Sequence, residues 1–433
     1  MINRNNVADE DVQRVVDGFK HYMQHAIETN DFSVAELKNF MEPIFERAGF
    51  RSTQGGGSKT HILVLHEAAA GDFVVMSSAI REIRRLYPNA YITLVVEKCA
   101  ASLAECCPYI DELIVESFKS NDTFLQDFDY DAQSVYTSYS IHLNVAEKLL
   151  RRRFDLAFAI VYGVYPTLSL SAYMSGARER ISHFGGMWSP LLTVNVEHFQ
   201  GSHVTDVALA YIETLIKTPV ANRKLEAWFS PFDLGQVQSM LPTCNALYAI
   251  GLGGSAPKRH YPPESYAALM NMIIRENDGV HFVLLGGKTE QSEASLIMSS
   301  VEPNRVTDLT GRISFRQTTA TLSLCDMFIG NDTGTRHLAS ATDTPVLSPN
   351  CFPLELPRPV SLNMWYPYEI PAVMVCPRHA LDDCKNSTDH FGCAAAHPHC
   401  ITQIAPLDMF RGYKLLLERI AKGINKPLFI GCK

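Results

Sequence analysis

The sequence predicts an α/β protein made of two doubly wound parallel-sheet domains that follow a helical segment. From residue 61 onward, short apolar runs alternate with amphipathic stretches, which is the pattern of βαβ units. The alternation weakens over residues 226–245 and then starts again. At 433 residues the chain is also too long for one ordinary core, since a domain takes about 150 residues. We therefore expect a helical extension and linker over residues 1–58, a first α/β domain over residues 59–235 and a second over residues 236–433.

The helical extension is predicted from two stretches with apolar residues at helical spacing, DEDVQRVVDGFKHYMQHAIE and SVAELKNFMEPIFERAGF. The stretch STQGGGSK that follows is typical of a flexible linker. The extension carries no motif with a chemical function. Two roles stay open for it: packing against the body of the protein, or assembly of a homo-oligomer.

The first α/β domain opens with the strand HILVLH, and its loop enters a helix through Gly71 and Asp72. An Asp at this position is often only the N-cap of the helix. If it faces the substrate instead, its carboxylate can act as the general base on an acceptor hydroxyl. Glu67 in the same loop is the reserve candidate for that base.

The second domain opens with ALYAIGLGGSA, in which Gly253 and Ser255 belong to a GxGxxA match. Such a turn lets backbone amides approach a phosphate at a helix N-terminus. Dinucleotide binding also requires an acidic residue at the end of the next strand, and that strand ends in Gly286 and Gly287. An NAD-dependent enzyme is therefore disfavoured.

Lys258, Arg259 and His260 stand directly before a helix that opens with two prolines. Cations beside a helix N-terminus predict a phosphate site, because charge and free backbone N–H groups act together. A loop with ordinary surface cations is the alternative. Glu290, after LLGGKT, is a weaker candidate for binding a nucleotide ribose.

A strand-to-helix turn with several polar groups lies in MFIGNDTGTRHLASATDTP, residues 327–345. The Thr333 hydroxyl and the amides around Gly334 can take phosphate oxygens. Asp332 cannot hold a phosphate, but it can accept hydrogen bonds from sugar hydroxyls; the alternative is that Asp332 or Asn331 only caps the helix. His337, one helical turn later, could donate to a phosphate or pack in the interior.

Four cysteines gather in a segment that also contains several histidines: Cys376, Cys384, Cys393 and Cys400. Thiols in a short irregular segment suit a structural zinc or iron site, although no CxxC spacing is present. Free buried thiols and disulfides stay open as alternatives. A metal here would stabilise the loop and leave the chemistry of the protein elsewhere.

Composition excludes several classes of protein. A net charge of -8 argues against a nucleic-acid partner, because phosphate backbones are bound mainly by clustered Lys and Arg. We find neither a signal peptide nor an apolar run long enough to span a membrane, and so expect a cytoplasmic protein. The arginines at 81, 84, 85 and 151–153 are expected on solvated helix faces, which could still contact an anionic membrane surface peripherally.

Several of these segments, in this order, resemble glycosyltransferase family 9, the ADP-heptose:lipopolysaccharide heptosyltransferases. GDFVVMSSAIREIRRLYPNAYITLVV resembles the opening of these enzymes, and GNDTGTRHLASATDTPVL resembles their C-terminal motif. KRHYPPESYAAL resembles their K/R-x-W-P segment, with Tyr261 where Trp is usual. The resemblance covers roughly residues 60–420.

The resemblance implies a GT-B architecture, in which two Rossmann-like domains face each other across a cleft. It also implies metal-independent, inverting transfer of a sugar from a nucleotide sugar such as ADP-heptose, with no cofactor required for the chemistry. Asp72 matches the catalytic base of the family, and Arg259 matches the residue that neutralises the leaving diphosphate. The donor-binding loop matches Asp332, Thr333, Gly334 and His337. Further donor-binding candidates are Gly71, Gly253, Ser255, Lys258 and Glu290.

The acceptor is the least specified part of this expectation. It could be a hydroxyl of a lipopolysaccharide core sugar, of another glycan or of a protein. The helical extension is not part of the usual enzyme, and the loop HEAAAGD lacks the polar residues often found before Gly-Asp. A non-catalytic sugar-nucleotide-binding or scaffold protein is the main alternative.

Overall fold

The chain folds into two compact α/β units, each with its own parallel sheet. The first unit takes residues 1–69, 79–200 and 206–221, and the second takes residues 70–78, 201–205 and 222–433. The computed structural model describes residues 7–51, 59–66, 68–116, 133, 135–136, 143–160, 166–182, 186–196, 202–254, 256–355, 363–381 and 398–432. Helix α10 (Pro231–Met240) spans the position between residues 235 and 236 where the sequence places the domain boundary.

The first unit contains a six-stranded sheet in the order β3-β2-β1-β4-β5-β6, with parallel pairing throughout. Its strands are β1 (His61–His66), β2 (Tyr91–Glu97), β3 (Glu112–Glu116), β4 (Leu156–Ala159), β5 (Glu179–Ser182) and β6 (Val194–Asn195). Its helices are α1 (Asp9–Thr29), α2 (Val34–Arg47), α4 (Ser77–Leu86), α5 (Ala101–Ala104), α7 (Leu143–Leu150), α8 (Pro166–Met174) and α9 (Val204–Ile216). The strand order reverses between β1 and β4, which is the point where doubly wound sheets bind their ligands.

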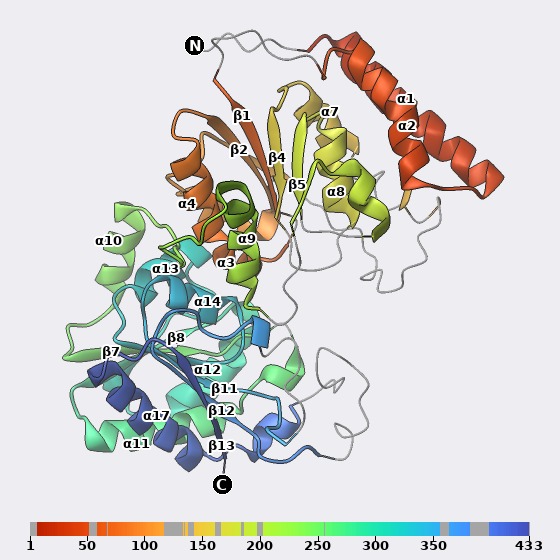
Figure 1. The fold of residues 1–433 in the computed structure, drawn as a ribbon. Coiled ribbons are helices and arrows are strands. Elements are labelled where there is room, and N and C mark those ends of the chain that lie inside the picture. Colours follow the sequence, from red (N-terminus) through yellow and green to blue (C-terminus); the bar gives the residue numbers. More distant parts are fainter. Residues whose placement is uncertain are drawn as a thin grey trace. The chain divides into compact units, whose positions relative to one another are not determined.

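The two predicted N-terminal helices are present as α1 and α2 (Figure 1). Their apolar faces share one buried cluster with side chains of α7 and α8 of the same unit. Phe50, just after α2, packs so closely on Gly176 that a Cβ added there would lie 2.5 Å from the Phe50 ring. The extension is therefore an integral part of the first unit's core.

The second unit contains a seven-stranded parallel sheet in the order β13-β12-β11-β10-β7-β8-β9. Its strands are β7 (Ala246–Gly251), β8 (Val280–Leu285), β9 (Val306–Asp308), β10 (Met327–Gly330), β11 (Val346–Pro349), β12 (Ala372–Cys376) and β13 (Pro427–Gly431). Its longer helices are α10, α11 (Pro263–Glu276), α12 (Gln291–Ser300), α13 (Phe315–Leu322), α14 (Gly334–Ala341) and α17 (Pro406–Ala421), and α3 (Ala70–Val75) belongs to it as well.

Both sheets repeat one topology. Counted from β7, the second sheet follows the order of the first with β13 added at one edge. Central strands such as β8, VHFVLL, are buried along their whole length, as expected for parallel strands covered on both faces. The prediction of an α/β fold with two doubly wound domains is confirmed.

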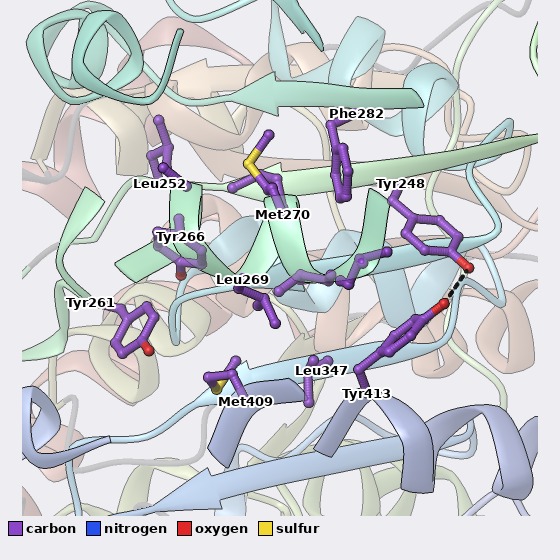
Figure 2. Packing of buried hydrophobic residues seen from close by; sticks show 14 of the residues in the cluster. Tyr248, Leu252, Tyr261, Tyr266, Leu269, Met270, Phe282, Leu347, Met409 and Tyr413 are labelled. Atoms are coloured by element: carbon purple, nitrogen blue, oxygen red, sulfur yellow. Dashed lines mark hydrogen bonds between the residues drawn. The ribbon is translucent and has the colours of Figure 1, made fainter. Parts of the chain in front are cut away.

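The core of the second unit lies between its sheet and helices α11 and α17. Figure 2 shows Tyr248 of β7 and Tyr413 of α17 with their hydroxyl groups 3.5 Å apart in this otherwise apolar layer. Tyr261 and Tyr266 pack edge to face at the start of α11, with ring centroids 5.0 Å apart. This buried layer supports the loops that follow β7 and β10, which flank the switch point of the second sheet.

The described part of the chain has no helix that is both long and apolar enough to cross a membrane.

Candidate functional site

The polar turn of residues 331–334 lies at the carboxyl end of β10, beside the switch point. Thr333 is the N-cap of α14, with φ -147° and ψ 174°, and its side chain makes no capping hydrogen bond. Capping therefore explains neither the Thr333 hydroxyl nor the carboxylate of Asp332. The helix begins at Gly334, so the free N–H groups of its first turn point out of the end of the sheet.

Asn331 fixes the position of this turn. Its side-chain oxygen accepts hydrogen bonds from the Tyr261 amide at 3.1 Å and the Tyr266 hydroxyl at 2.8 Å. Its side-chain nitrogen donates to the carbonyl oxygens of Leu252 at 2.6 Å and Gly253 at 3.4 Å. The completely buried amide thus joins the β10 turn to the loop after β7 and to the start of α11. Sequence reasoning considered Asn331 only as a helix cap and missed this role.

Asp332 lies between two arginines. Arg336, which is only 1% exposed, donates from Nη2 to one carboxylate oxygen of Asp332. Arg259 Nη1 lies 3.8 Å from the other oxygen. Burial by itself would raise the pKa of Asp332, but the charges of Arg336 and Arg259 outweigh it and lower the pKa. Asp332 is therefore an ionised carboxylate inside a positively charged surrounding.

His337 is buried one turn further along α14. Burial, reinforced by the neighbouring charge of Arg336, lowers the pKa of His337 to about 3. Its Nδ1 atom has no hydrogen-bond partner among the residues that the structure describes. At neutral pH this side chain is an uncharged imidazole. Its Nδ1 atom can form one hydrogen bond with a ligand, but the ring supplies no positive charge.

Helix α3, which carries Gly71 and Asp72 in its first turn, contacts α14 directly. A Cβ on Gly71 would lie 3.0 Å from the Gly334 Cα and 3.4 Å from His337 Cδ2. A Cβ on Gly334 would in turn lie 3.5 Å from the Gly71 backbone. Gly71 allows the backbones of the two turns to approach this closely, because a side chain at that position would press on the Gly334 backbone, whereas a Cβ on Gly334 would be in ordinary contact. The candidate base Asp72 and the candidate donor loop are thus brought together in one compact unit.

The loop after β7 supplies the remaining candidates. Arg259 ends the 3-10 helix η3 (Pro257–Arg259), directly after Lys258, and both side chains are half-buried. The Nε atom of Arg259 has no partner in the described ranges. A Cβ on Gly253 would lie 3.6 Å from a carboxylate oxygen of Glu290. Ser255 and the reserve base Glu67 lie outside the described residues.

The carboxylate of Glu290 is already hydrogen-bonded within its own loop. Its carboxylate accepts hydrogen bonds from the Gly287 amide at 2.6 Å and from the Thr289 hydroxyl at 2.7 Å. One role of Glu290 is therefore to shape the turn after β8, beside Gly253.

His260, which the sequence places with Lys258 and Arg259 before α11, supports the glycine loop. Its ring lies within hydrogen-bond distance of the Gly254 carbonyl, at 3.1 Å, and of Glu293, at 3.3 Å. The hydrogen bond with Glu293 raises the pKa of His260. A Cβ on Gly254 would come within 2.9 Å of the ring, so only glycine fits over it.

The predicted cysteine cluster is described in part. Cys376 and Cys400 are buried, while Cys384 and Cys393 lie outside the described residues. The sulfur of Cys400 lies 3.4 Å from Nδ1 of His399. No group of three or more His, Cys, Asp or Glu side chains arranged to hold a metal occurs in the part of the chain that the structure describes.

Together, these turns form a surface suited to an anion with hydroxyl groups nearby. The N–H groups of α14 and the guanidinium of Arg259 can bind phosphate oxygens. The carboxylate of Asp332 can accept hydrogen bonds from hydroxyl groups. A second carboxylate, Asp72, belongs to the turn that contacts the start of α14.

The chain is similar in sequence to known glycosyltransferases. Residues 188–348 match the model of glycosyltransferase family 9 (heptosyltransferase). The chain is 24% identical over 292 residues to the lipopolysaccharide core heptosyltransferase OpsX of Haemophilus influenzae, a match that covers 66% of this chain and 77% of that protein. It is 19% identical over 303 residues to lipopolysaccharide heptosyltransferase 2 of Salmonella typhimurium, covering 66% of this chain and 81% of that protein.

Solved structures show the same fold. A glycosyl transferase family 9 protein from Veillonella parvula has a TM-score of 0.67 and 18% identity, over 84% of this chain and 100% of that one. The ADP-heptose LPS heptosyltransferase II of E. coli has a TM-score of 0.58 and 17% identity, again over 84% and 100%. The two doubly wound units thus have the GT-B architecture of these enzymes. The chain is similar to proteins of glycosyltransferase family 9, and the activity that this similarity supports is glycosyl transfer.

Proposed function

We propose that the protein is an inverting glycosyltransferase that moves heptose from ADP-heptose to a hydroxyl acceptor. The observation that carries the proposal is the contact between the turns of α3 and α14, where Gly71 and Gly334 meet. This contact puts the helix turn of Asp72 beside a turn rich in backbone amides and positive charge. The names of the relatives, which are heptosyltransferases, support the choice of sugar.

The donor is held by the second unit. Arg259, Lys258 and the amides at Gly334 bind the diphosphate, and Thr333 adds a hydroxyl. Asp332 accepts hydrogen bonds from hydroxyl groups of the sugar. The loop of Gly253 and Ser255 approaches the nucleotide.

His337 joins the donor site as a neutral group, because its pKa is lowered to about 3. It therefore orients a phosphate or sugar oxygen through a hydrogen bond. The positive charge of the site comes from the arginines and Lys258.

Asp72 acts as the general base. Its carboxylate takes the proton from the acceptor hydroxyl as that oxygen attacks the anomeric carbon. The bond from the anomeric carbon to the diphosphate oxygen breaks on the opposite face, which inverts the configuration. The electron pair leaves with the diphosphate, whose growing negative charge is stabilised by Arg259 and the α14 amides.

The acceptor belongs to the less specified part of the proposal. The relatives are named for lipopolysaccharide, so a sugar of a lipopolysaccharide core is the first candidate, and other glycans or a protein hydroxyl follow. Peripheral membrane contact, a homo-oligomer built through the N-terminal helices and a cytoplasmic location stay predictions.

The transfer chemistry proposed here requires no metal, since the arginines and amides compensate the charge of the leaving group. The structural zinc or iron site at Cys376, Cys384, Cys393 and Cys400 stays a separate prediction. Metal analysis of the purified protein would test it, and the four-cysteine proposal fails if neither metal is present.

The proposal is tested by Asp72→Asn, with Asp11→Asn in the first turn of α1 as the matched control. We expect release of ADP from ADP-heptose, in the presence of a heptose-deficient lipopolysaccharide, to fall about 10²- to 10⁴-fold in Asp72→Asn, as is typical for loss of a general base. ADP should still raise the thermal stability of both variants, because a ligand that binds only the native state stabilises it.

Each result that departs from this expectation has its own interpretation. Full turnover by Asp72→Asn would remove Asp72 from the mechanism. Stabilisation of the wild type by ADP without release of ADP from ADP-heptose, with any acceptor offered, would favour a non-catalytic sugar-nucleotide-binding protein. No stabilisation by any nucleoside diphosphate would contradict the proposed function.

A further inference from the structure

Arg336 is a buried cation, and its bonds to the described residues leave two of its nitrogens without an acceptor. Its Nη2 atom donates to Asp332 and, at 2.8 Å, to the carbonyl oxygen of Trp365. Its Nε and Nη1 atoms have no acceptor within the described ranges of the chain. Because burying a guanidinium without full hydrogen bonding is costly, a structural role alone does not explain this arrangement.

The bond from Arg336 determines which oxygen of Asp332 is available. Oδ1 of Asp332 is engaged by Arg336. Oδ2 faces Arg259 at 3.8 Å, which is an ion-pair distance but too long for a hydrogen bond. One carboxylate oxygen is therefore fixed, and the other stays able to accept a hydrogen bond from a ligand.

Arg336 also determines the charge that a diphosphate would meet. Without it, the negative charge of Asp332 would cancel the positive charge of Arg259, and the neutral His337 would add nothing. With it, Asp332 is paired and the charge of Arg259 is available. A carboxylate repels a neighbouring diphosphate unless a nearby cation compensates the negative charge of the carboxylate.

We propose that Arg336 is a positioning residue of the donor site, which holds Asp332 by one oxygen and neutralises it so that the same turn can bind a nucleoside diphosphate. The inference rests on the proposed function, since it specifies how the donor loop combines a carboxylate for hydroxyl groups with a site for phosphate. In this account Arg336 acts through Asp332 on the ligand.

The test is a cycle of variants titrated with ADP by calorimetry. In Arg336→Met, an unpaired carboxylate faces the diphosphate, and we expect ADP to bind at least about tenfold more weakly than to the wild type, a change of about 1.4 kcal/mol. In the double variant Asp332→Asn/Arg336→Met both charges are gone. ADP affinity should then return to within about threefold of the wild type, while glycosyl transfer stays low because Asp332 is missing.

Each variant is titrated as folded protein, so that recovery of affinity by the second substitution reports the charge that the diphosphate meets. Arg275→Met, at the exposed end of α11, is the matched control, and ADP should bind it as it binds the wild type. If Arg336→Met does not fold, the double variant still decides the question, because it buries neither charge and must bind ADP.

The outcomes separate the inference from the proposed function. Unchanged ADP affinity in Arg336→Met, or a double variant that binds ADP no better than Arg336→Met, overturns the role of Arg336 alone. A wild-type protein that does not bind ADP overturns the proposed function and, with it, the inference.

Discussion

Each unit contains a partly or fully buried arginine paired with a carboxylate, and the two pairs differ in how completely they are satisfied. In the first unit, Arg51 donates from Nε and Nη2 to Glu42, at 2.8 and 3.1 Å, and from Nη1 to the carbonyl oxygens of Gly176 and Ala177, at 3.0 and 3.4 Å. Every donor nitrogen of Arg51 therefore has an acceptor. In the second unit, two of the three nitrogens of Arg336 have none among the described residues.

The surroundings of the two pairs match this difference. Arg51 also lies over the Phe45 ring, 4.4 Å from its centroid, and so joins the end of α2 to the end of α8. Arg336 lies at the carboxyl end of the sheet, beside the α14 turn and Arg259. A completed network fastens one part of the fold to another, whereas an incomplete one at a switch point indicates a ligand.

The largest effect on stability is expected from Arg51→Met in the first unit. The substitution removes the guanidinium that pairs with Glu42 and the Arg51 donor to the Gly176 carbonyl, while the Ala177 carbonyl keeps its bond from Arg180 Nη1 at 2.6 Å. Because the two side chains are 16% and 27% exposed, we expect a loss of about 2 kcal/mol in the free energy of unfolding, below the value for fully buried pairs. Urea denaturation measures it, and ADP affinity should stay that of the wild type.

Arg14→Met is the control for this prediction, since Arg14 pairs with Asp11 at the surface of α1 and is 48% exposed. Its loss should cost less than about 0.5 kcal/mol. Equal effects of the two substitutions would show that the Arg51 network is no more than a surface ion pair. A marked loss of ADP affinity in Arg51→Met would contradict the division into a structural and a ligand-binding network.

A smaller effect is expected on the pH dependence of the free energy of unfolding, through His337 of the second unit. His337 has its pKa lowered to about 3 in the folded protein, so below its ordinary value of 6.5 only the unfolded chain binds the proton. Stability therefore falls as pH falls, and between pH 6.5 and 5.5 His337 should account for a loss of about 1 kcal/mol. The free energy of unfolding of wild type and His337→Gln, measured at both pH values, isolates this contribution. An identical pH dependence of the two proteins would show that the pKa of His337 is not lowered in the native state.

The sequence predicted most of the framework. Apolar runs such as HILVLH and VHFVLL are strands β1 and β8, because fully buried parallel strands need continuous apolar residues. The two N-terminal helices follow their apolar spacing, and the turn at Asp332 and Gly334 lies where a strand ends and a helix begins. All of these features depend on local pattern.

The features that the sequence did not predict depend on which segments meet in space. The four hydrogen bonds of Asn331 reach Leu252, Gly253, Tyr261 and Tyr266, far away along the chain. The burial of Arg336 and the contact of α3 with α14 likewise come from tertiary packing. Arg336 was visible in the sequence as a charged residue near the polar turn at the end of β10. Its pairing with Asp332 was not.

The central claim is that the turns after β7 and β10 form a site for a nucleoside diphosphate, and calorimetric titration of ADP into wild type and Arg259→Met tests it most directly. We predict that ADP binds the wild type and binds Arg259→Met at least about tenfold more weakly, because a charge-assisted bond to phosphate is lost. Arg275→Met should bind ADP as the wild type does. Equal ADP affinity in Arg259→Met and the wild type would contradict the account.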